Sequence, residues 1–193
     1  MEKFSKLKTQ IGVKEKEDIL YQNDHMTLIN HEDWTFVKER DAVICIPYLI
    51  ETNQIVIRQE WIPSYQYADG QEYHLALVGG SIEQGETPEV ALLRELQEEA
   101  GIVLRDNFKI EFDKPLFIAK HCSAKYYPVI LTLTESDYHE ISPTTDGSKF
   151  EQMSKTGKVD IKYIKGLNAP DLVTELMLTR LKEYLNIPAS KFY

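Results

Sequence analysis

Three glutamates and one arginine stand close together, at positions that a helix would bring to one side. In RELQEE, residues 94–99, a rotation of about 100° per residue sets Glu95, Glu98 and Glu99 within about 100° of arc. Arg94 is one turn before Glu98 and can orient a carboxylate by a charge-assisted hydrogen bond. Carboxylates this close repel by roughly 2–3 kcal/mol at an effective dielectric of about 20, so the cluster predicts a bound cation.

The ligand chemistry of this cluster indicates a hard divalent cation. Carboxylate oxygens suit Mg²⁺ or Mn²⁺, and no His or Cys stands at helical spacing from them, which disfavours zinc. The alternative is a solvated acidic helix face, which is what most charge clusters are. The preceding segment GSIEQGE, residues 80–86, favours the cation site because a glycine-rich loop lets the backbone approach a metal or phosphate closely.

The loop and the helix together resemble one known signature. Residues 80–102, GSIEQGETPEVALLRELQEEAGI, match without a gap the pattern of the Nudix hydrolases: Gly, five residues, Glu, seven residues, then Arg-Glu-apolar-any-Glu-Glu-any-Gly-apolar. Each fixed position has a chance of roughly one in ten to twenty at ordinary composition, so an accidental match is improbable.

This resemblance implies a fold, a reaction and a set of residue roles. Nudix proteins adopt an α/β/α sandwich with a mixed central sheet and mostly hydrolyse a nucleoside diphosphate linked to another moiety, using Mg²⁺ or Mn²⁺. By position, the resemblance assigns metal binding to Glu95, Glu98, Glu99 and Gly80, catalysis to Glu98 and Arg94, and bracing of the loop and the helix end to Glu86 and Gly101. One of the three metal-site glutamates would serve as the base if no other residue does.

A base outside the signature is a further expectation from the resemblance. In some branches it lies in the loop before the last strand, and this chain has a long polar stretch there, residues 135–158. Glu140, Asp146 and Glu151 are the candidates, of which we favour Glu151 as a catalytic residue. The alternative for each is a solvated loop charge.

Outside the signature, the chain looks like the ADP-ribose and nucleotide-sugar pyrophosphatases. In that branch, N-terminal strands exchange between two subunits and build the nucleotide pocket. The resemblance therefore implies a homodimer, with residues 1–40 as an N-terminal β-strand extension and dimerisation arm and residues 41–193 as the hydrolase domain. Trp61 replaces an arginine of that branch, Ala76 replaces a glutamate, and KHCS at 120–123 replaces a proline-glycine loop. These departures leave the substrate open.

Five residues are candidates for substrate binding. Trp34, Phe36 and Trp61 offer rings that could stack on a base, although core packing is the commoner fate of such residues. Arg58 and Lys120 could meet phosphate or sugar oxygens, and exposure to solvent is the alternative for both.

These features predict a Mg²⁺-dependent pyrophosphohydrolase, with Mn²⁺ as a substitute, that acts on ADP-ribose or a nucleotide sugar. Another diphosphate is the first alternative: a dinucleoside polyphosphate, a capped RNA end or an oxidised nucleoside triphosphate. A Nudix-fold module that senses a nucleotide without hydrolysing it is the second, and the full set of carboxylates disfavours it.

The central element that positions the site is a helix over residues 88–100. Thr87 can cap it, Pro88 suits its first position and Gly101 can close it. Val90, Leu93, Leu96 and Ala100 mark the expected buried face, which would leave the three glutamates on an exposed stripe. A second helix is expected between Pro170 and Leu185.

Strand patterns surround the two helices, so the sequence predicts a mixed α/β fold. A hairpin is expected over 19–29 with a turn at 22–24, and a polar gap over 63–72. Further strands are expected over residues 34–37, 42–50, 55–61, 73–78, 108–118, 127–134 and 159–164.

Composition excludes several classes of protein. The 193 residues hold 22 Lys and Arg against 31 Asp and Glu, and 22 − 31 gives a net charge of −9, which disfavours nucleic acid or an anionic membrane as a partner. No apolar run of about 18 residues and no targeting segment is present. Cys45 and Cys122 lack metal-type spacing and are expected to be reduced thiols. We expect a soluble cytoplasmic protein with a small-molecule nucleotide substrate.

Overall fold

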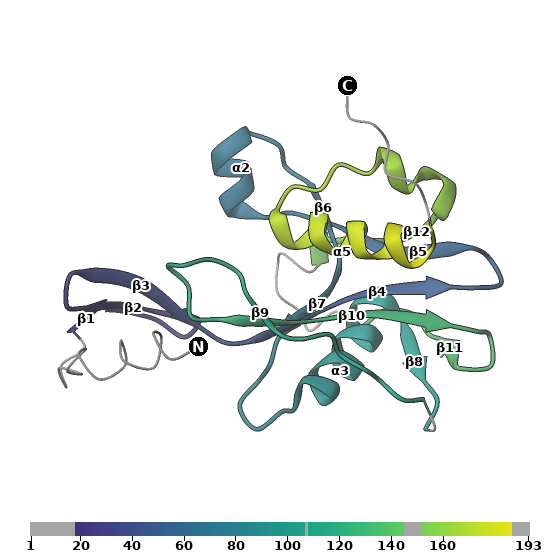
Figure 1. Cartoon of the computed structure of the whole chain (residues 1–193), viewed down its shortest axis with the longest axis horizontal. Coiled ribbons are helices and arrows are strands. Elements are labelled where there is room, and N and C mark those ends of the chain that lie inside the picture. The colour runs from purple at the N-terminus through teal and green to yellow at the C-terminus, as the bar shows by residue number, and fades with distance from the viewer. Residues whose placement is uncertain (1–17, 107, 145–151, 187–193) are drawn as a thin grey trace, which may run out of the picture. The chain divides into compact units, whose positions relative to one another are not determined.

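The structure, a computed structural model, describes residues 18–106, 108–144 and 152–186, which fall into two compact units (Figure 1). The first unit comprises the described parts of Met1–Arg40 together with Phe117–Ala124. The second comprises the described parts of Asp41–Leu116 and Lys125–Tyr193.

The first unit is built on an antiparallel sheet of β1 (Asp18–Gln22), β2 (Met26–His31) and β3 (Trp34–Glu39). The turn between β1 and β2 forms because the Asn23 side chain accepts hydrogen bonds from the backbone N–H groups of His25 (2.9 Å) and Met26 (2.8 Å). The predicted hairpin and the third strand are therefore confirmed.

The segment Phe117–Ala124 joins this unit through main-chain pairing with β3. The Val37 N–H donates to the His121 carbonyl (2.8 Å), and the Ser123 N–H donates to the Val37 carbonyl (2.9 Å). Nothing in the local sequence pattern predicts this pairing, because the partners are more than 80 positions apart.

The second unit contains a mixed sheet, as predicted. Its strands run in the order β12, β5, β4, β10, β9, with β6 paired to β5 and β7 paired to β4. β10 is parallel to β4, whereas β5 and β7 are antiparallel to it. The strands are β4 (Ala42–Leu49), β5 (Gln54–Glu60), β6 (His74–Ala76), β7 (Val78–Ser81), β9 (Leu116–Phe117), β10 (Lys125–Leu133) and β12 (Lys155–Asp160). A separate antiparallel pair consists of β8 (Ile102–Leu104) and β11 (Tyr138–Glu140).

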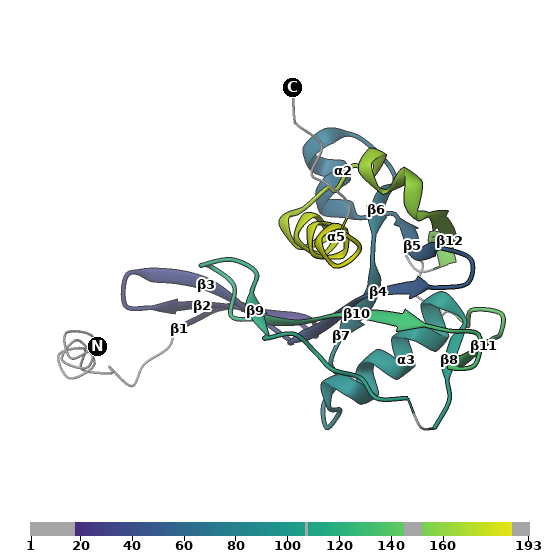
Figure 2. The same ribbon diagram turned by 45° about the vertical axis from the view of Figure 1, so that its right-hand side comes forward.

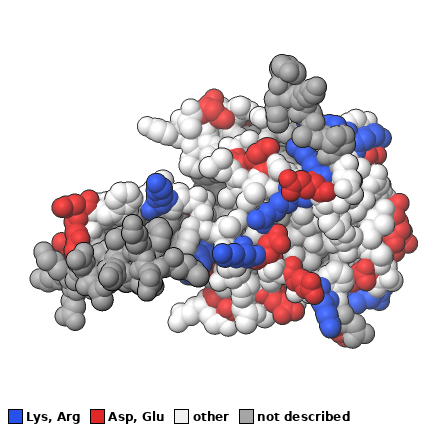
Figure 3. Space-filling view, viewed as in Figure 1, with Lys and Arg blue, Asp and Glu red and all other residues white. Residues whose placement is uncertain are grey.

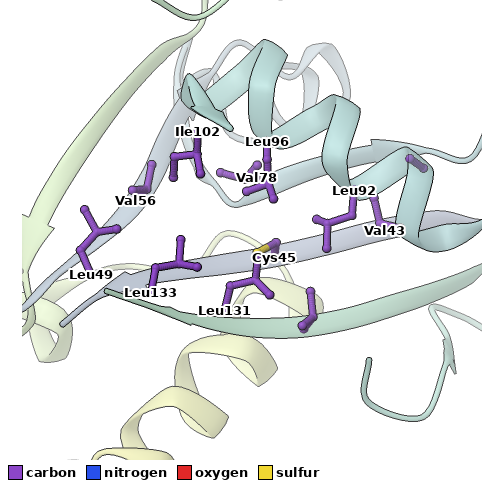
Figure 4. Packing of buried hydrophobic residues seen from close by; sticks show 12 residues of the cluster. Val43, Cys45, Leu49, Val56, Val78, Leu92, Leu96, Ile102, Leu131 and Leu133 are labelled. Carbon is purple, nitrogen blue, oxygen red and sulfur yellow. The ribbon is translucent and has the colours of Figure 1, made fainter. Parts of the chain in front are cut away.

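Helices cover both faces of this sheet. α3 (Pro88–Ala100) lies on one face, and α5 (Leu172–Tyr184) with α2 (Pro63–Asp69) lies on the other, as Figures 1 and 2 show. Figure 4 shows Leu92 and Leu96 projecting from α3 toward the sheet, beside Val43 and Val78. Burial of these apolar side chains stabilises the layered arrangement and fixes α3 against the strands that flank the site.

A second core lies on the α5 side of the sheet. Met177, Leu178 and Leu181 are fully buried there against strand residues such as Ile46 and Ile55. Asp171 caps α5 by accepting hydrogen bonds from the N–H groups at its first turn, and the turn η2 (Ile161–Gly166) precedes it. None of the helices in the described ranges has the length and apolar character needed to cross a membrane.

Four predicted segments differ from the structure in detail. Residues 108–118 form a strand only at Leu116–Phe117, because Phe108, Ile110 and Phe112 pack on the core from an irregular segment. The expected strand over 159–164 is shifted: β12 ends at Asp160 and a 3₁₀ turn follows. The gap at 63–72 holds α2, and the polar stretch at 135–158 contains β11 and the start of β12.

Candidate functional site

The helix α3 carries the glutamate cluster, and its two ends are fixed as the sequence predicts. Thr87 caps the first turn, with its hydroxyl oxygen accepting from the Val90 N–H at 3.3 Å, and Pro88 occupies the first position. Gly101 closes the helix in the left-handed conformation, with φ of 65°. A Cβ at Gly101 would lie 2.2 Å from the Ile141 carbonyl oxygen, so glycine is required there on two counts.

The prediction that the glutamates form an exposed stripe is wrong. Glu95 and Glu99 are only 8% and 9% exposed, whereas Val90 and Leu93, placed on the buried face by the sequence, are 50% and 40% exposed. The face that packs on the sheet is instead centred on Leu92 and Leu96. Two of the three carboxylates are therefore held inside the protein, where an uncompensated charge is costly.

A small cavity gathers the three carboxylates. It has a volume of about 150 Å³, and its lining comes from β5, α3, β12 and the chain around them. The lining residues are Arg58, Glu95, Glu98, Glu99, Pro143, Ser154 and Thr156. Among the ionisable side chains of this lining, three negative charges and one positive charge give −3 + 1 = −2. This net negative charge favours a cation over an anion in the cavity.

Arg94 links the loop before α3 to the carboxylates on it. Its guanidinium contacts both oxygens of Glu86 (3.0 and 3.2 Å), Glu95 (2.7 Å) and Glu98 (3.2 Å), and it donates to the Ser81 carbonyl (3.0 Å). Glu86 also accepts from the Glu83 N–H at 2.9 Å, so the loop and the helix share one network. The hydrogen bond from Arg94 lowers the pKa of Glu86, which keeps that carboxylate charged.

Gly80 lies directly beneath Glu95. It belongs to β7, which continues to Ser81, so the strand expected over residues 73–78 is divided into β6 and β7 and extends beyond residue 78. A Cβ at Gly80 would lie 2.2 Å from Glu95 Oε1, which means that the carboxylate occupies the space a side chain would fill. Burial raises the pKa of Glu95, against the opposing effect of Arg94.

Glu99 is held at both of its carboxylate oxygens. Oε2 accepts from the Gly79 N–H at 2.9 Å, and Oε1 forms an ion pair with Nη1 of Arg58, which is only 3% exposed. The Arg58 guanidinium also contacts Glu60. The Glu99 carbonyl accepts from the Thr156 hydroxyl at 2.5 Å. Arg58, a candidate for substrate binding, contacts Glu99, and no local sequence pattern predicts this contact because the two positions are 41 apart.

The candidate bases fall in different places. Glu140 is exposed in β11 and forms an ion pair with Lys158 at 2.5 Å, and it does not line the cavity. Asp146 and Glu151 lie outside the described residues. Pro143 and Ser154, which are described, both line the cavity.

The other substrate candidates divide between the two units. Trp34 is 55% exposed on β3, Phe36 is half-buried on the same strand, and Lys120 is exposed in the segment that joins them in the first unit. Trp61 is half-buried and directly follows β5 in the second unit. Their roles in substrate binding remain predictions.

The donor set fits a hard divalent cation. All three side chains offer carboxylate oxygens, and the absence of a side chain at Gly80 leaves room for the carboxylate of Glu95. Across the described residues, no three His, Cys, Asp or Glu side chains are already arranged as a set of metal ligands. The carboxylates are held instead by Arg58 and Arg94, so binding of the cation requires some of these oxygens to exchange partners.

The chain is similar to a protein-family model, to a known protein and to a solved structure. A family model described as the NUDIX domain matches residues 38–152. An 8-oxo-dGTP diphosphatase of Haemophilus influenzae is 40% identical over 73 residues, which are 33% of this chain and 54% of that protein. The chain thus matches only about half the length of this relative.

A solved structure shares the fold over nearly the whole chain. The crystal structure of ADP compounds hydrolase superposes with a TM-score of 0.63 at 17% identity, covering 89% of this chain and 92% of that one. At this identity the likeness concerns the fold, and it confirms the predicted α/β/α arrangement. Since the family model covers more than half of the residues, and the signature forms the loop, the helix and the carboxylate cluster described above, the chain belongs to the Nudix family.

Proposed function

We propose that the chain is a divalent-metal-dependent pyrophosphohydrolase that cleaves the diphosphate bond of a nucleoside diphosphate derivative. The products are a nucleoside monophosphate and a phosphorylated remainder, and ADP-ribose or a nucleotide sugar is the first choice of substrate. The cavity lined by Glu95, Glu98 and Glu99 carries this proposal. The fold shared with a protein named ADP compounds hydrolase supports the choice of substrate.

The three glutamates would hold the metal, and their neighbours would fix their positions. A bound Mg²⁺ or Mn²⁺ supplies charge neutralisation at the diphosphate and activation of water. Arg94 orients Glu95 and Glu98, while the Gly79 N–H orients one oxygen of Glu99. Burial of Glu95 and Glu99 strengthens their electrostatic effect, since interactions between charges grow as water is excluded.

A proton must leave the attacking water, and we propose Glu151 as the residue that accepts it. Ser154 lines the cavity and stands three positions after Glu151, a length of chain that spans at most about 11 Å. Glu140 is the less favoured candidate because Lys158 already neutralises it. For substrate recognition, we propose that three aromatic side chains stack on the nucleobase: Trp34, Phe36 and Trp61. We propose that Lys120 contacts a phosphate of the substrate.

A second candidate substrate is an oxidised nucleoside triphosphate. The match to an 8-oxo-dGTP diphosphatase favours it, although that match covers only 33% of this chain. In both candidate substrates the bond cleaved is a phosphoric anhydride, so the carboxylates would have the same role. The two substrates differ in the groups attached to the phosphates, which the protein must recognise.

A capped RNA or another nucleic acid is a less favoured partner. The net charge of the chain is −9. On the face of the molecule drawn in Figure 3, Lys and Arg side chains lie among Asp and Glu side chains.

We further propose a cytoplasmic location, because Cys45 and Cys122 are both free thiols. Cell fractionation tests this location.

The first unit is proposed as a dimerisation arm. Ile19, Leu20, Tyr21 and Trp34 are each more than half exposed on β1 and β3, which is unusual for large apolar side chains unless a partner covers them. We expect light scattering after size-exclusion chromatography to give about twice the chain mass of 22.4 kDa. A single-chain mass across micromolar concentrations would contradict the dimer.

The proposed activity is tested by a turnover screen. ADP-ribose, nucleotide sugars, dinucleoside polyphosphates and triphosphates including 8-oxo-dGTP are incubated with Mg²⁺ or Mn²⁺, and phosphate is measured after a coupled phosphatase step. We expect turnover of the ADP-containing diphosphates, and its complete loss in EDTA. Turnover confined to 8-oxo-dGTP would favour the second candidate. No turnover of any compound would favour a nucleotide sensor.

A further inference from the structure

Arg58 is a buried cation in contact with the acidic cavity. It extends from β5 and is 3% exposed, and its Nη1 forms ion pairs with Glu99 of α3 and Glu60 of its own strand. Its Nε is buried without a hydrogen-bond partner among the described residues. An arginine buried in this way is costly unless its charge is needed by a neighbour.

The neighbour that needs this charge is Glu99. Its side chain is 9% exposed, and its only other bond at the carboxylate, among the described contacts, is from the Gly79 N–H. A buried carboxylate with one neutral donor is poorly compensated. The guanidinium of Arg58 therefore supplies the positive charge that balances Glu99 in this structure.

The main chain on both sides of this contact is fixed independently of the ion pair. Thr156 is the cross-strand partner of Arg58 in the pairing of β12 with β5, and its hydroxyl bonds the Glu99 carbonyl at 2.5 Å. Glu60 offers Arg58 a second carboxylate that is 27% exposed. Because the guanidinium already contacts Glu60, it keeps one carboxylate partner if its contact with Glu99 is broken.

We propose that Arg58 is the built-in counter-cation of the metal site. It holds Glu99 when no divalent ion is bound, and it moves fully to Glu60 when one binds. Arg58 thus competes with the metal and sets the concentration at which the site fills. This inference rests on the proposed metal dependence, and it makes Arg58 a positioning residue for Glu99.

The test measures Mn²⁺ binding directly, by electron paramagnetic resonance on the full chain without substrate. Arg58→Met removes the competing charge at nearly unchanged length, so we expect Mn²⁺ to bind about tenfold or more tightly, because a cation next to the ion is removed. The same variant should melt at a lower temperature in EDTA and gain more from added Mn²⁺ than the wild type does. Arg180→Met is the matched control, since Arg180 pairs with Asp113 away from the cavity.

A second variant keeps the inference falsifiable if Arg58→Met does not fold. Glu60→Gln leaves Arg58 in place but replaces the carboxylate to which Arg58 would move with a neutral amide. Arg58 should then stay at Glu99, and Mn²⁺ should bind several-fold more weakly. Equal or weaker Mn²⁺ binding by Arg58→Met, or unchanged binding by Glu60→Gln, would overturn the inference while leaving the proposed function intact. Wild-type protein that binds no Mn²⁺ would overturn both.

Discussion

Glu98→Gln and Glu99→Gln are each expected to lower kcat by a factor of about 10²–10³, the range for removing one preorganised electrostatic contact from a reaction centre. Both carboxylates line the cavity. Glutamine has nearly the shape of glutamate but no charge, so the loss reports the charge and not the packing. Steady-state hydrolysis of the best substrate from the screen, at saturating Mg²⁺, gives the comparison.

The two variants should differ in stability. The Glu98 side chain is 27% exposed, and its ion pair with Arg94, at 3.2 Å, is partly exposed and therefore weak. Glu98→Gln should therefore change the free energy of unfolding little. Glu99 is the buried partner of Arg58, and Glu99→Gln leaves that guanidinium with Glu60 alone. We expect a loss of about 1–3 kcal/mol in the free energy of unfolding, measured by urea denaturation in EDTA.

The control for both variants is Glu140→Gln. Glu140 is an exposed glutamate in the same unit, and its removal costs a surface ion pair with Lys158, so turnover and stability should stay near the wild-type values. In the same assay, Glu151→Gln should lower kcat if Glu151 is the base. Wild-type turnover in both Glu98→Gln and Glu99→Gln would show that the cavity is not the reaction centre.

The sequence predicts the ends of α3 well because the signals there are local. Thr87, Pro88 and Gly101 act on backbone groups within one turn of themselves, so their effect does not depend on the rest of the fold. The hairpin of β4 and β5 is predictable for a similar reason: its β-branched runs are joined by a short polar turn.

The buried face of α3 could not be predicted in the same way. Leu92 and Leu93 are adjacent and equally apolar, and the pattern gives no reason to choose between the faces they mark. The structure buries Leu92 together with Glu95 and Glu99. Charged residues can occupy a buried face only because Arg58 and Arg94 compensate them, and Arg58 comes from a distant strand.

Backbone pairing and packing also override local patterns elsewhere. β12 begins with the polar residues Lys155 and Thr156, yet it forms a strand because its backbone pairs along β5. Phe108 and Phe112 lie in a strand-like sequence, yet they pack on the core from an irregular segment. The helix α2 begins at Pro63, which is a local start signal, but it has no side-chain cap at Ile62 and buries none of its residues, so no apolar face in the sequence predicts it.

Gly80→Ala is expected to cost activity far more than stability. The added Cβ would lie 2.2 Å from Oε1 and 2.7 Å from Cδ of Glu95. These atoms are the far end of a flexible side chain, so the carboxylate can swing aside while the backbone stays. A displacement of about 1 Å at a reacting group costs on the order of a hundredfold, and we expect kcat to fall by about that factor.

The neighbouring glycine gives the contrasting case. A Cβ at Gly79 would lie 2.2 Å from the Val43 carbonyl oxygen, a backbone atom that cannot move aside, so Gly79→Ala should lower the melting temperature strongly. Gly166→Ala is the matched control, because its Cβ would meet nothing within 4 Å. If Gly80→Ala kept the wild-type kcat and metal affinity, the position of Glu95 above β7 would not matter for hydrolysis. If Gly80→Ala lowered kcat only to the extent that it lowered the melting temperature, Gly80 would be needed for stability and not for hydrolysis.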